Sequence, residues 1–485
     1  MSEHASTGAA LLERITRETA RFATLQVFGA FVTGAATLIL ARLLDPRAFG
    51  VYAIGTFFLG LGSLLGDGGL GATLLRKKGD VTDDEYHVTA TFLFALGAAL
   101  AVTFFVTAPF IAAYNHLTAR EGAVLRAMAP LFLAGPLRAV PYIRLERELR
   151  FGEIGRIELL SLIARQLAAI AFAWAFGGAW ALAGAQITGM LSQLALAYMV
   201  SPGAPKLLWR PAVLAPLLGY GVRVQALGIA AFFKDNISAA LLGRLVGPQA
   251  VGVFDFGVKY AQLPVLAVNA LARVQLPAYA RFEAHDPALH RAVATVTRTA
   301  LLLGIAMLVT MSAGASSIIP FAYAPRWIES VPVVWGLLPN MVGGLVAGPL
   351  FTLLQAQGRA GLALRAFAVW TLSTWALVLA VRHHGLGAIA AAHGVITVAM
   401  VLWLIAWAGH HMGRPLWRFY VGPVSAGLGA VTLVLAARRA APWMHAGWAS
   451  ALAALASYVG LLTVIEGRRT RDDVASLVRA LVKRR

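Results

Sequence analysis

The chain of 485 residues contains no cysteine, and only 13% of its residues are charged. The missing cysteine excludes disulfide bonds, thiolate metal ligands and a cysteine nucleophile. The scarcity of charge argues against an ordinary soluble protein of this length, in which about a quarter of the residues are charged. With 59% hydrophobic residues and a mean hydropathy of +0.73, the composition is typical of a membrane protein.

Short motifs that carry enzyme chemistry are missing as well. No Gly-Lys, no His-Glu and no Asp-x-Asp occurs, which argues against an ATP-binding loop, a zinc protease and a metal-dependent sugar transferase. Gly66, Gly68 and Gly71 match the spacing of a dinucleotide-binding loop, but they follow an apolar helix rather than a strand. The sequence therefore predicts a protein that is not an enzyme and uses no metal or cofactor.

Apolar stretches dominate the chain. Crossing a hydrocarbon core of ~30 Å takes about 20 residues as a helix. Fourteen stretches meet this length, at approximately 22–44, 48–70, 88–115, 121–143, 156–176, 178–200, 213–242, 250–275, 292–320, 331–356, 361–381, 386–409, 417–437 and 444–466. We expect an all-α, polytopic membrane protein with about 14 transmembrane helices, whose first span acts as its own insertion signal.

Basic residues are distributed unevenly between the connections. The net charge is +19, but 28 Lys and Arg residues belong to one side of the predicted topology and eight to the other. This asymmetry is the positive-inside pattern, and with an even number of spans it predicts that both termini are cytoplasmic. Because position in the loops accounts for the basic residues, we expect no nucleic-acid partner.

A twelve-residue motif occurs twice. Residues 41–52 read ARLLDPRAFGVY and residues 243–254 read GRLVGPQAVGVF, with six identical pairs. Six predicted spans separate the copies, so both run in the same direction through the membrane. We interpret this as two six-span lobes in parallel pseudo-symmetry, related by an axis along the membrane normal. Pro46 and Pro248 are expected to end the first helix of each lobe, and Gly50 and Gly252 are expected near the start of the next helix.

The predicted organisation follows from the repeat and from the connections. It comprises an amphipathic cytoplasmic leader (1–21), an N-lobe (22–200), a cytoplasmic linker (201–212), a C-lobe (213–409), spans 13 and 14 outside the symmetry (410–466), and a basic cytoplasmic tail (467–485). Leader and tail are expected to lie on the membrane surface. Prolines crowd the fourth span and interrupt the eighth, which predicts kinked helices there.

Charged residues within the spans are the candidates for function, because a cation at the bilayer centre costs ~2.5 to 3.5 kcal/mol. They are Arg126, Arg165, Arg223, Lys234, Lys259, Asp67, Asp235 and Asp255. Such groups are expected to face a water-filled cavity or one another. Structural pairing is the alternative, since Asp255 and Lys259 are four residues apart on one helix.

Several motifs in a fixed order resemble the polysaccharide flippases of the multidrug/oligosaccharidyl-lipid/polysaccharide exporter superfamily. They are ARLLDPRAFGVYAI, DGGLGATLLRKKG, KDNISAALLGRLVGPQAVGVFDFGVKYA, LPAYARF, APRWIESVP, LLQAQGR and GLGAIAAAHG. Asp235 matches an acidic position of the family, whereas Phe254 stands where tyrosine is common.

The resemblance implies a flippase in the bacterial inner membrane. Its substrate would be an undecaprenyl-diphosphate-linked oligosaccharide for O-antigen or exopolysaccharide assembly, moved by alternating access. The implied partners are this lipid-linked substrate, membrane lipids and polysaccharide assembly proteins.

A specific substrate site is predicted around the second copy of the motif. Lys234 lies nine residues before the outer turn and Lys259 nine residues after it, so both are expected about 13 Å below the outer helix ends. We hypothesise that these lysines contact the diphosphate, with Asp235 and Asp255 as exchangeable partners. Arg223 and Arg126 are predicted as secondary contacts.

Two other functions stay open. A cation-coupled multidrug exporter of the same superfamily is expected to carry a carboxylate early in its first lobe, and the span from Phe22 to Leu44 has none. A membrane-bound polymerase or glycosyltransferase needs a larger outer loop or metal-binding carboxylates. A structural scaffold is disfavoured by the charges within the spans.

Overall fold

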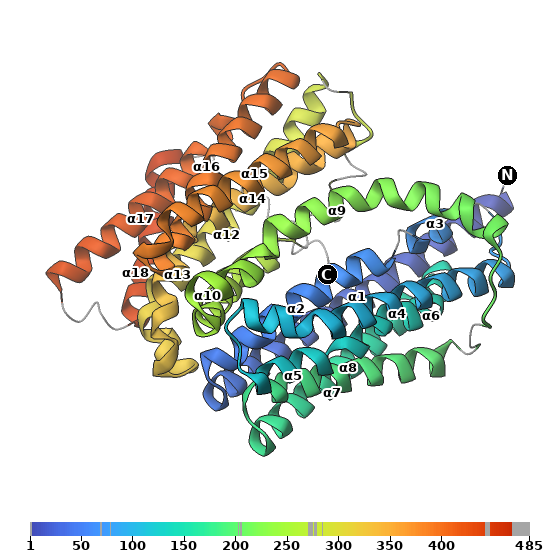
Figure 1. The fold of residues 1–485 in the computed structure, drawn as a ribbon. Coiled ribbons are helices and arrows are strands. Elements are labelled where there is room, and N and C mark those ends of the chain that lie inside the picture. Colours follow the sequence, from blue (N-terminus) through green and yellow to red (C-terminus); the bar gives the residue numbers. More distant parts are fainter. Residues whose placement is uncertain are drawn as a thin grey trace. The chain divides into compact units, whose positions relative to one another are not determined.

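The computed structural model describes residues 2–67, 70–77, 79–201, 203, 206–269, 275, 279–283, 285–441 and 447–467. Every regular element in these residues is helical, in agreement with the predicted fold class. Contacts divide the chain into two compact units, Met1–Gly252 and Val253–Arg485. Each unit is described by itself, with helices labelled as in Figure 1.

Nine α-helices and one 3-10 helix lie in the described part of the first unit. They are α1 (Ser2–Leu43), α2 (Pro46–Asp67), α3 (Leu70–Arg76), α4 (Asp83–Tyr114), α5 (Ala119–Ala127), η1 (Ala129–Leu133), α6 (Ala134–Arg147), α7 (Phe151–Ala175), α8 (Gly178–Val200) and α9 (Pro211–Val246). The predicted leader is part of the continuous helix α1, because residues 1–21 contain no proline that would end a helix.

The second unit holds most of α10, which begins at the end of the first unit, and the elements that follow. They are α10 (Pro248–Asn269), α12 (Pro287–Ala322), η3 (Pro325–Ser330), α13 (Val331–Gly336), α14 (Leu338–Ala356), α15 (Ala360–Val381), η4 (Arg382–His384), α16 (Leu386–His411), η5 (Trp417–Phe419), α17 (Val421–Ala440) and α18 (Gly447–Glu466). The predicted basic tail lies almost wholly outside the described residues.

Local sequence signals set several helix starts. The helices α1 and α9 end shortly before Pro46 and Pro248, as the repeat predicted, and the two prolines are the first residues of α2 and α10. Thr82 and Thr118 cap α4 and α5, and in each case a glutamate three residues later completes a capping box. These pairs satisfy backbone N–H groups that have no partner within the helix.

The fourth predicted span is broken, as its prolines indicated. It consists of α5, the 3-10 helix η1 and α6, with Pro130 in η1 and Pro136 in the first turn of α6. Pro141 is accommodated inside α6, and Pro264 inside α10. The change from α to 3-10 geometry around Pro130 confirms the predicted distortion.

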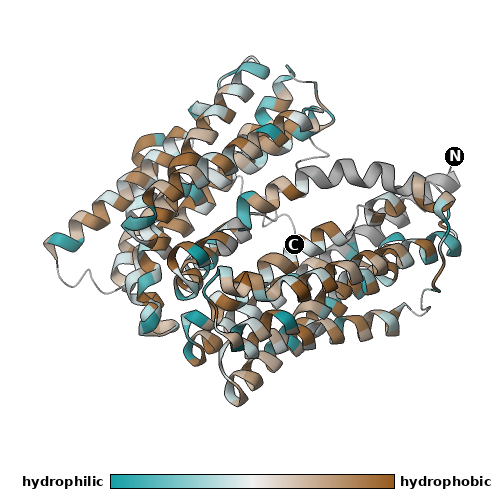
Figure 2. Cartoon of the chain, in the orientation of Figure 1, coloured by the Kyte–Doolittle hydropathy of each residue, from teal (hydrophilic) through white to brown (hydrophobic). Residues whose placement is uncertain are grey.

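Eleven helices in the described part of the chain are long and apolar enough to cross a membrane. Three more predicted spans coincide with α8, α9 and α10, which are not among the eleven. The exact number of 14 spans therefore stays a prediction. Figure 2 shows that apolar residues recur along the described helices, between short polar stretches.

Polar contacts connect α17 and α18 to α12 near both ends of this pair of helices. Arg298 of α12 and Glu466 of α18 form a salt bridge in which both side chains are only 7% exposed. At the opposite end of α17, Arg438 donates a hydrogen bond to Ser450 Oγ over 2.9 Å and another to the Ala313 carbonyl of α12. Spans 13 and 14 are thus integral to the packing of the second unit.

Candidate functional site

A cavity of ≈ 980 Å³ lies within the first unit. Residues of α2, α3, α4, η1, α6, α7 and α8 line it. The lining side chains include the charged or larger polar residues Arg138, Tyr142, Glu146, Glu158, Arg165, Gln186 and Gln193, together with the hydroxyl residues Thr56, Ser63 and Ser161. A polar cavity of this size inside a bundle of membrane-spanning helices is the main candidate for a substrate site.

Helical periodicity brings these polar residues to the same cavity. On α6, Arg138, Tyr142 and Glu146 are spaced by four residues and share one face. On α8, Gln186 and Gln193 are seven residues, or two turns, apart. The sequence therefore places these polar groups on the faces of α6 and α8 that line the cavity.

One group of polar contacts lies between α6 and α8, and we call it the Arg138 cluster: Arg138, Tyr142 and Gln193. The guanidinium carbon of Arg138 lies 5.0 Å from the centre of the Tyr142 ring. Gln193 Nε2 donates a hydrogen bond to Tyr142 Oη over 2.9 Å. Tyr142 thus contacts Arg138 through its ring, in a cation–π contact, and Gln193 through its hydroxyl group.

A second group, the Arg165 cluster, contains Arg165, Gln186 and Tyr52. Tyr52 Oη donates to Gln186 Oε1 over 3.0 Å, and Arg165 Nη1 donates to the same oxygen over 3.3 Å. Arg165 passes close to α8 at Gly189, where an added Cβ would lie 2.8 Å from Arg165 Cβ. The glycine therefore leaves room for the arginine side chain.

The Arg165 cluster lies deep within the helices. Arg165 is about 21 Å from the start of α7 and about 15 Å from its end, at 1.5 Å per residue. Tyr52 closes the first copy of the repeated motif, and the equivalent residue of the second copy is Phe254, which has no hydroxyl group. Only the first copy of the motif can therefore make the hydrogen bond from this position to Gln186.

Two carboxylates share the cavity with the two arginines. Glu158 Oε2 accepts a hydrogen bond from Gln26 Nε2 of α1 over 2.5 Å, and Glu146 lines the cavity near the end of α6. The two arginines and two glutamates give the described lining a formal charge of zero. The charged residues that the sequence predicted within the spans are, in contrast, mostly basic. Arg138, Glu146 and Glu158 had been missed as cavity residues because they lie at the edges of predicted spans. Their spacing on α6 and α7 was the available signal.

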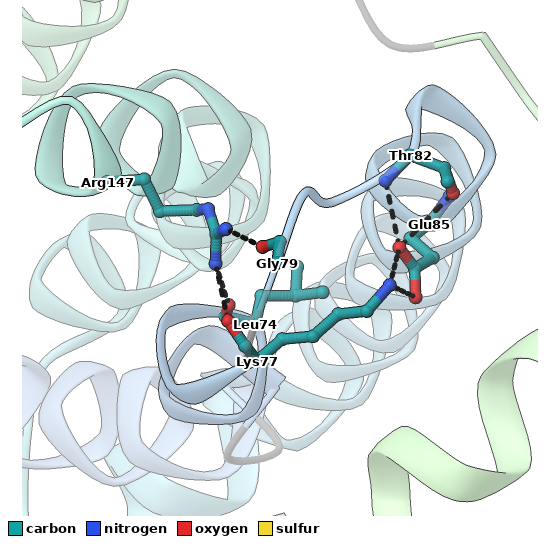
Figure 3. A network of polar contacts seen from close by, with 6 residues as sticks. All are labelled: Leu74, Lys77, Gly79, Thr82, Glu85 and Arg147. Carbon is teal, nitrogen blue, oxygen red and sulfur yellow. Dashed lines mark hydrogen bonds and ion pairs between the residues drawn. The ribbon is translucent and has the colours of Figure 1, made fainter.

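The end of the cavity at α3 is held by a polar network, drawn in Figure 3. Gly71 and Leu75 of α3 line the cavity. Arg147, the last residue of α6, donates hydrogen bonds to the carbonyls of Leu74 over 2.8 Å and Lys77 over 3.3 Å, and also to the carbonyl of Gly79. A cation at these carbonyls suits the C-terminal end of α3, where backbone C=O groups have no helical partner.

The same network joins α3 to α4. Lys77 Nζ contacts both carboxylate oxygens of Glu85, at 2.7 and 2.6 Å. Glu85 also accepts from the backbone N–H of Thr82 over 2.9 Å, as part of the capping box. Figure 3 shows Arg147 reaching the α3–α4 connection from α6, while Lys77 extends from this connection to Glu85 of α4. This connection is therefore fixed by side chains of α6 and of the connection itself.

Among the described residues of the first unit, Lys234 and Arg126, which were predicted from the sequence as substrate contacts, do not line this cavity. In the first unit, Lys234 is paired with its neighbour Asp235, and Arg126 is exposed with its guanidinium 5.6 Å from the centre of the Phe105 ring. In the second unit, Lys259 Nζ lies 2.6 Å from Asp255 Oδ2, as their spacing predicted.

Lys234 is 19% exposed and Lys259 is 61% exposed. The side chains of Arg223 and Asp67 lie outside the described residues. Within the described chain, no group of three or more His, Asp or Glu residues is placed to hold a metal ion. The roles assigned to the lysines and their acidic partners stay predictions.

Comparison with known proteins gives a consistent result. A family model described as "Polysaccharide biosynthesis protein" matches residues 39–332. The chain is 24% identical over 366 residues to the teichuronic acid biosynthesis protein TuaB of Bacillus subtilis, covering 70% of this chain and 72% of that protein. It is 25% identical over 372 residues to the succinoglycan biosynthesis transport protein ExoT of Rhizobium meliloti, covering 76% and 72%.

A solved structure has a similar fold. The lipid II flippase MurJ, in an inward closed conformation, superposes with a TM-score of 0.74 over 91% of this chain and 98% of that chain, at 13% sequence identity. At this identity the likeness is one of fold. The helices that enclose the cavity therefore belong to an architecture that also occurs in a membrane flippase.

Proposed function

Because the chain belongs to the polysaccharide biosynthesis protein family, we propose that it is a flippase for lipid-linked oligosaccharides. It takes an oligosaccharide carried on a polyprenyl diphosphate from the cytoplasmic leaflet and presents it outside the membrane. The observation that supports this most directly is the polar cavity of ≈ 980 Å³ within helices that span the membrane.

The chemistry of the cavity matches both parts of such a headgroup. Arg138 and Arg165 offer guanidinium groups, which bind phosphate oxygens through paired, charge-assisted hydrogen bonds. Gln186, Gln193 and Tyr142 offer amide and hydroxyl groups, which pair with sugar hydroxyls. The apolar polyprenyl chain would stay in the bilayer while the headgroup crosses.

The lysines predicted from the sequence belong to the same proposal. Lys234, Lys259, Arg223 and Arg126 are retained as further contacts for the phosphates, and Asp235 and Asp255 as their partners. Movement of the two predicted lobes would expose the substrate first to one side of the membrane and then to the other. The protein would act in the bacterial cytoplasmic membrane with both termini inside, and it would change no covalent bond.

A direct test is removal of the protein from the cell that makes it. Synthesis of the lipid-linked oligosaccharide continues while export stops, so the intermediate should accumulate in the cytoplasmic leaflet of spheroplasts. The sidedness can be measured with a membrane-impermeant reagent that labels the saccharide. Normal surface polymer and no stranded intermediate, in a cell without a second exporter, would refute the proposal.

Cation-coupled drug export is the second candidate, because Glu146 and Glu158 supply carboxylates inside the cavity. In that case, loss of the protein would raise sensitivity to cationic drugs and leave the lipid-linked intermediate correctly distributed. The Glu158→Gln variant separates the two functions. If the protein exports drugs, this variant should abolish drug resistance. Accumulation of the lipid-linked oligosaccharide in the cytoplasmic leaflet is the readout that is specific to the flippase proposal.

A further inference from the structure

A second cavity lies in the other unit, at the end of α16. It forms a groove of ≈ 540 Å³ between one face of this helix and the connection that leads to η5. Leu402, Ala406 and Gly409 line it from α16, and Arg414 and Trp417 line it from the connection. The groove is separate from the cavity assigned to the oligosaccharide.

The helix side of the groove is an apolar stripe. Leu402, Ala406 and Gly409 follow the spacing of one helix face and cover about 10 Å of α16. The Leu402 side chain is 62% exposed in the described structure. α16 is among the helices that are apolar enough to cross the membrane. Such a stripe fits a hydrocarbon chain that runs parallel to the helix.

The other end of the groove is cationic and aromatic. His410 and Arg414 line it, and Trp417 is 52% exposed with the Arg418 guanidinium 5.6 Å from its ring centre. Arg414 follows the end of α16 by three residues, which places it where the helix leaves the hydrocarbon. Tryptophan and arginine at this level are typical of contacts with lipid headgroups.

Backbone contacts give this end of the groove a defined shape. The backbone N–H of Arg414 donates to the Gly409 carbonyl over 3.0 Å, so the chain turns back against α16. A Cβ on Gly409 would lie 3.4 Å from the Arg414 carbonyl oxygen, at van der Waals contact. The neighbouring segment carries Glu283, which is exposed, and Asp286, whose carboxylate accepts from the backbone N–H of Ala288 over 2.7 Å at the start of α12.

We propose that this groove binds an anionic phospholipid. One acyl chain lies along Leu402, Ala406 and Gly409, and the phosphate lies against Arg414 and His410. The cationic rim selects an anionic headgroup over a zwitterionic one, because a guanidinium pairs with phosphate without a competing positive charge on the ligand. The apolar stripe inside a membrane-spanning segment favours a lipid over a soluble anion or a peptide.

Photo-crosslinking in intact membranes tests the identity of the occupant. A photoreactive phenylalanine derivative replaces Leu402 in the full chain, and the adducts are identified by mass spectrometry. The control replaces Leu428, which is 68% exposed on α17 and does not line the groove. We expect phosphatidylglycerol and cardiolipin to be enriched at least about threefold at position 402 relative to position 428. Adducts with a second copy of the chain or with another protein, or equal lipid profiles, would overturn the proposal.

A binding experiment tests the headgroup contact. Purified full-length protein in neutral detergent is titrated with phosphatidylglycerol or phosphatidylcholine, and bound lipid is counted by native mass spectrometry. We expect Arg414→Gln to weaken phosphatidylglycerol binding about tenfold, the effect of losing one charge-assisted contact, and to leave phosphatidylcholine unchanged.

The matched control is Arg382→Gln, which changes an arginine before the start of α16, at the opposite end of that helix. It should bind phosphatidylglycerol as the unmodified protein does. The Tm of each variant without added lipid checks that it is folded. Equal affinity of the unmodified protein for both lipids would refute the proposal, as would equal losses in the Arg414→Gln and Arg382→Gln variants.

Discussion

Gly50 and Gly252 each lie against the first turn of the other's helix. A Cβ added to Gly50 would lie 1.7 Å from the carbonyl oxygen of Pro248, and a Cβ added to Gly252 would lie 1.8 Å from the carbonyl oxygen of Pro46. All four residues belong to the first unit. Equivalent positions of the two motif copies thus contact each other reciprocally, as expected for a local two-fold relation.

This contact explains why both copies keep glycine at the same place. We predict that Gly50→Ala and Gly252→Ala each lower the stability by more than about 3 kcal/mol, because a backbone carbonyl cannot move aside as a side chain can. The measurement is the Tm of the purified protein, together with its yield in membranes.

Gly34→Ala is the matched control, since nothing lies within 4 Å of a Cβ at this position of α1. Alanine there should be neutral, or stabilising by roughly 0.5 to 1 kcal/mol through helix propensity. If Gly50→Ala were as stable as Gly34→Ala, the close contact between the motif copies would be wrong.

The two arginines of the cavity should be required for export. We expect Arg138→Gln and Arg165→Gln each to reduce export at least about tenfold, because each substitution removes a charge-assisted contact to phosphate. Export is measured as surface polymer per amount of protein in the membrane. Arg120→Gln, an exposed arginine that does not line the cavity, serves as the control and should export normally.

The lysines predicted from the sequence are tested in parallel. We expect Lys234→Gln and Lys259→Gln to abolish export while membrane insertion is retained, since removing a charge lowers the cost of insertion. Lys206→Gln, in the exposed linker, is the control. Normal export by both variants at unchanged protein levels would make Lys234 and Lys259 structural, and the cavity arginines would carry the phosphate contacts alone.

Tyr52 is expected to position the Arg165 cluster. The Tyr52→Phe variant keeps the ring but removes the hydrogen bond to Gln186, which frees the amide that also contacts Arg165. Export should fall by about three- to tenfold, with a loss of stability of about 1 kcal/mol. Tyr114→Phe, at an exposed tyrosine of α4, should change neither quantity. Full export by Tyr52→Phe would show that Gln186 is held by other contacts.

The buried pair that holds α18 to α12 predicts a large effect on stability. Glu466→Gln leaves the Arg298 guanidinium without its counter-ion in a site where both side chains are 7% exposed, so we expect a loss of about 3 to 5 kcal/mol. The double variant Arg298→Gln, Glu466→Gln should recover much of this loss, because no uncompensated charge remains. Thermal unfolding with Arg291→Gln, an exposed arginine of α12, as the control provides the measurement.

The sequence predicted the helices well, because apolar length and proline positions act locally. The helix breaks predicted at Pro46, Pro248 and Pro130 are present in the structure, although Pro46 and Pro248 begin the following helices. The leader was predicted as a separate amphipathic element that lies on the membrane surface. The backbone nevertheless continues as one helix, since charge alone does not end a helix.

The candidate site was harder to predict, because a span predicted from hydropathy ends at the first charged residues. The helices continue beyond that point. Glu146 was therefore assigned to a connection, and Arg138 and Glu158 lay near the ends of predicted spans, although all three line the cavity. Arg165 was recognised as a charge within a span, but its amide partner Gln186 lies on another helix. Contacts of this kind depend on tertiary packing, which periodicity on a single helix cannot supply.

The short helix α3 gives the cavity one wall of low intrinsic stability. A helix of seven residues does not persist on its own in water, so α3 depends on Arg147 and on the Lys77–Glu85 pair for its order. Its amide protons should therefore exchange with solvent through local opening, while those of the long helices around it stay protected. Hydrogen exchange would then report the opening of this wall separately from the unfolding of the bundle, and Arg147→Gln should accelerate only the former.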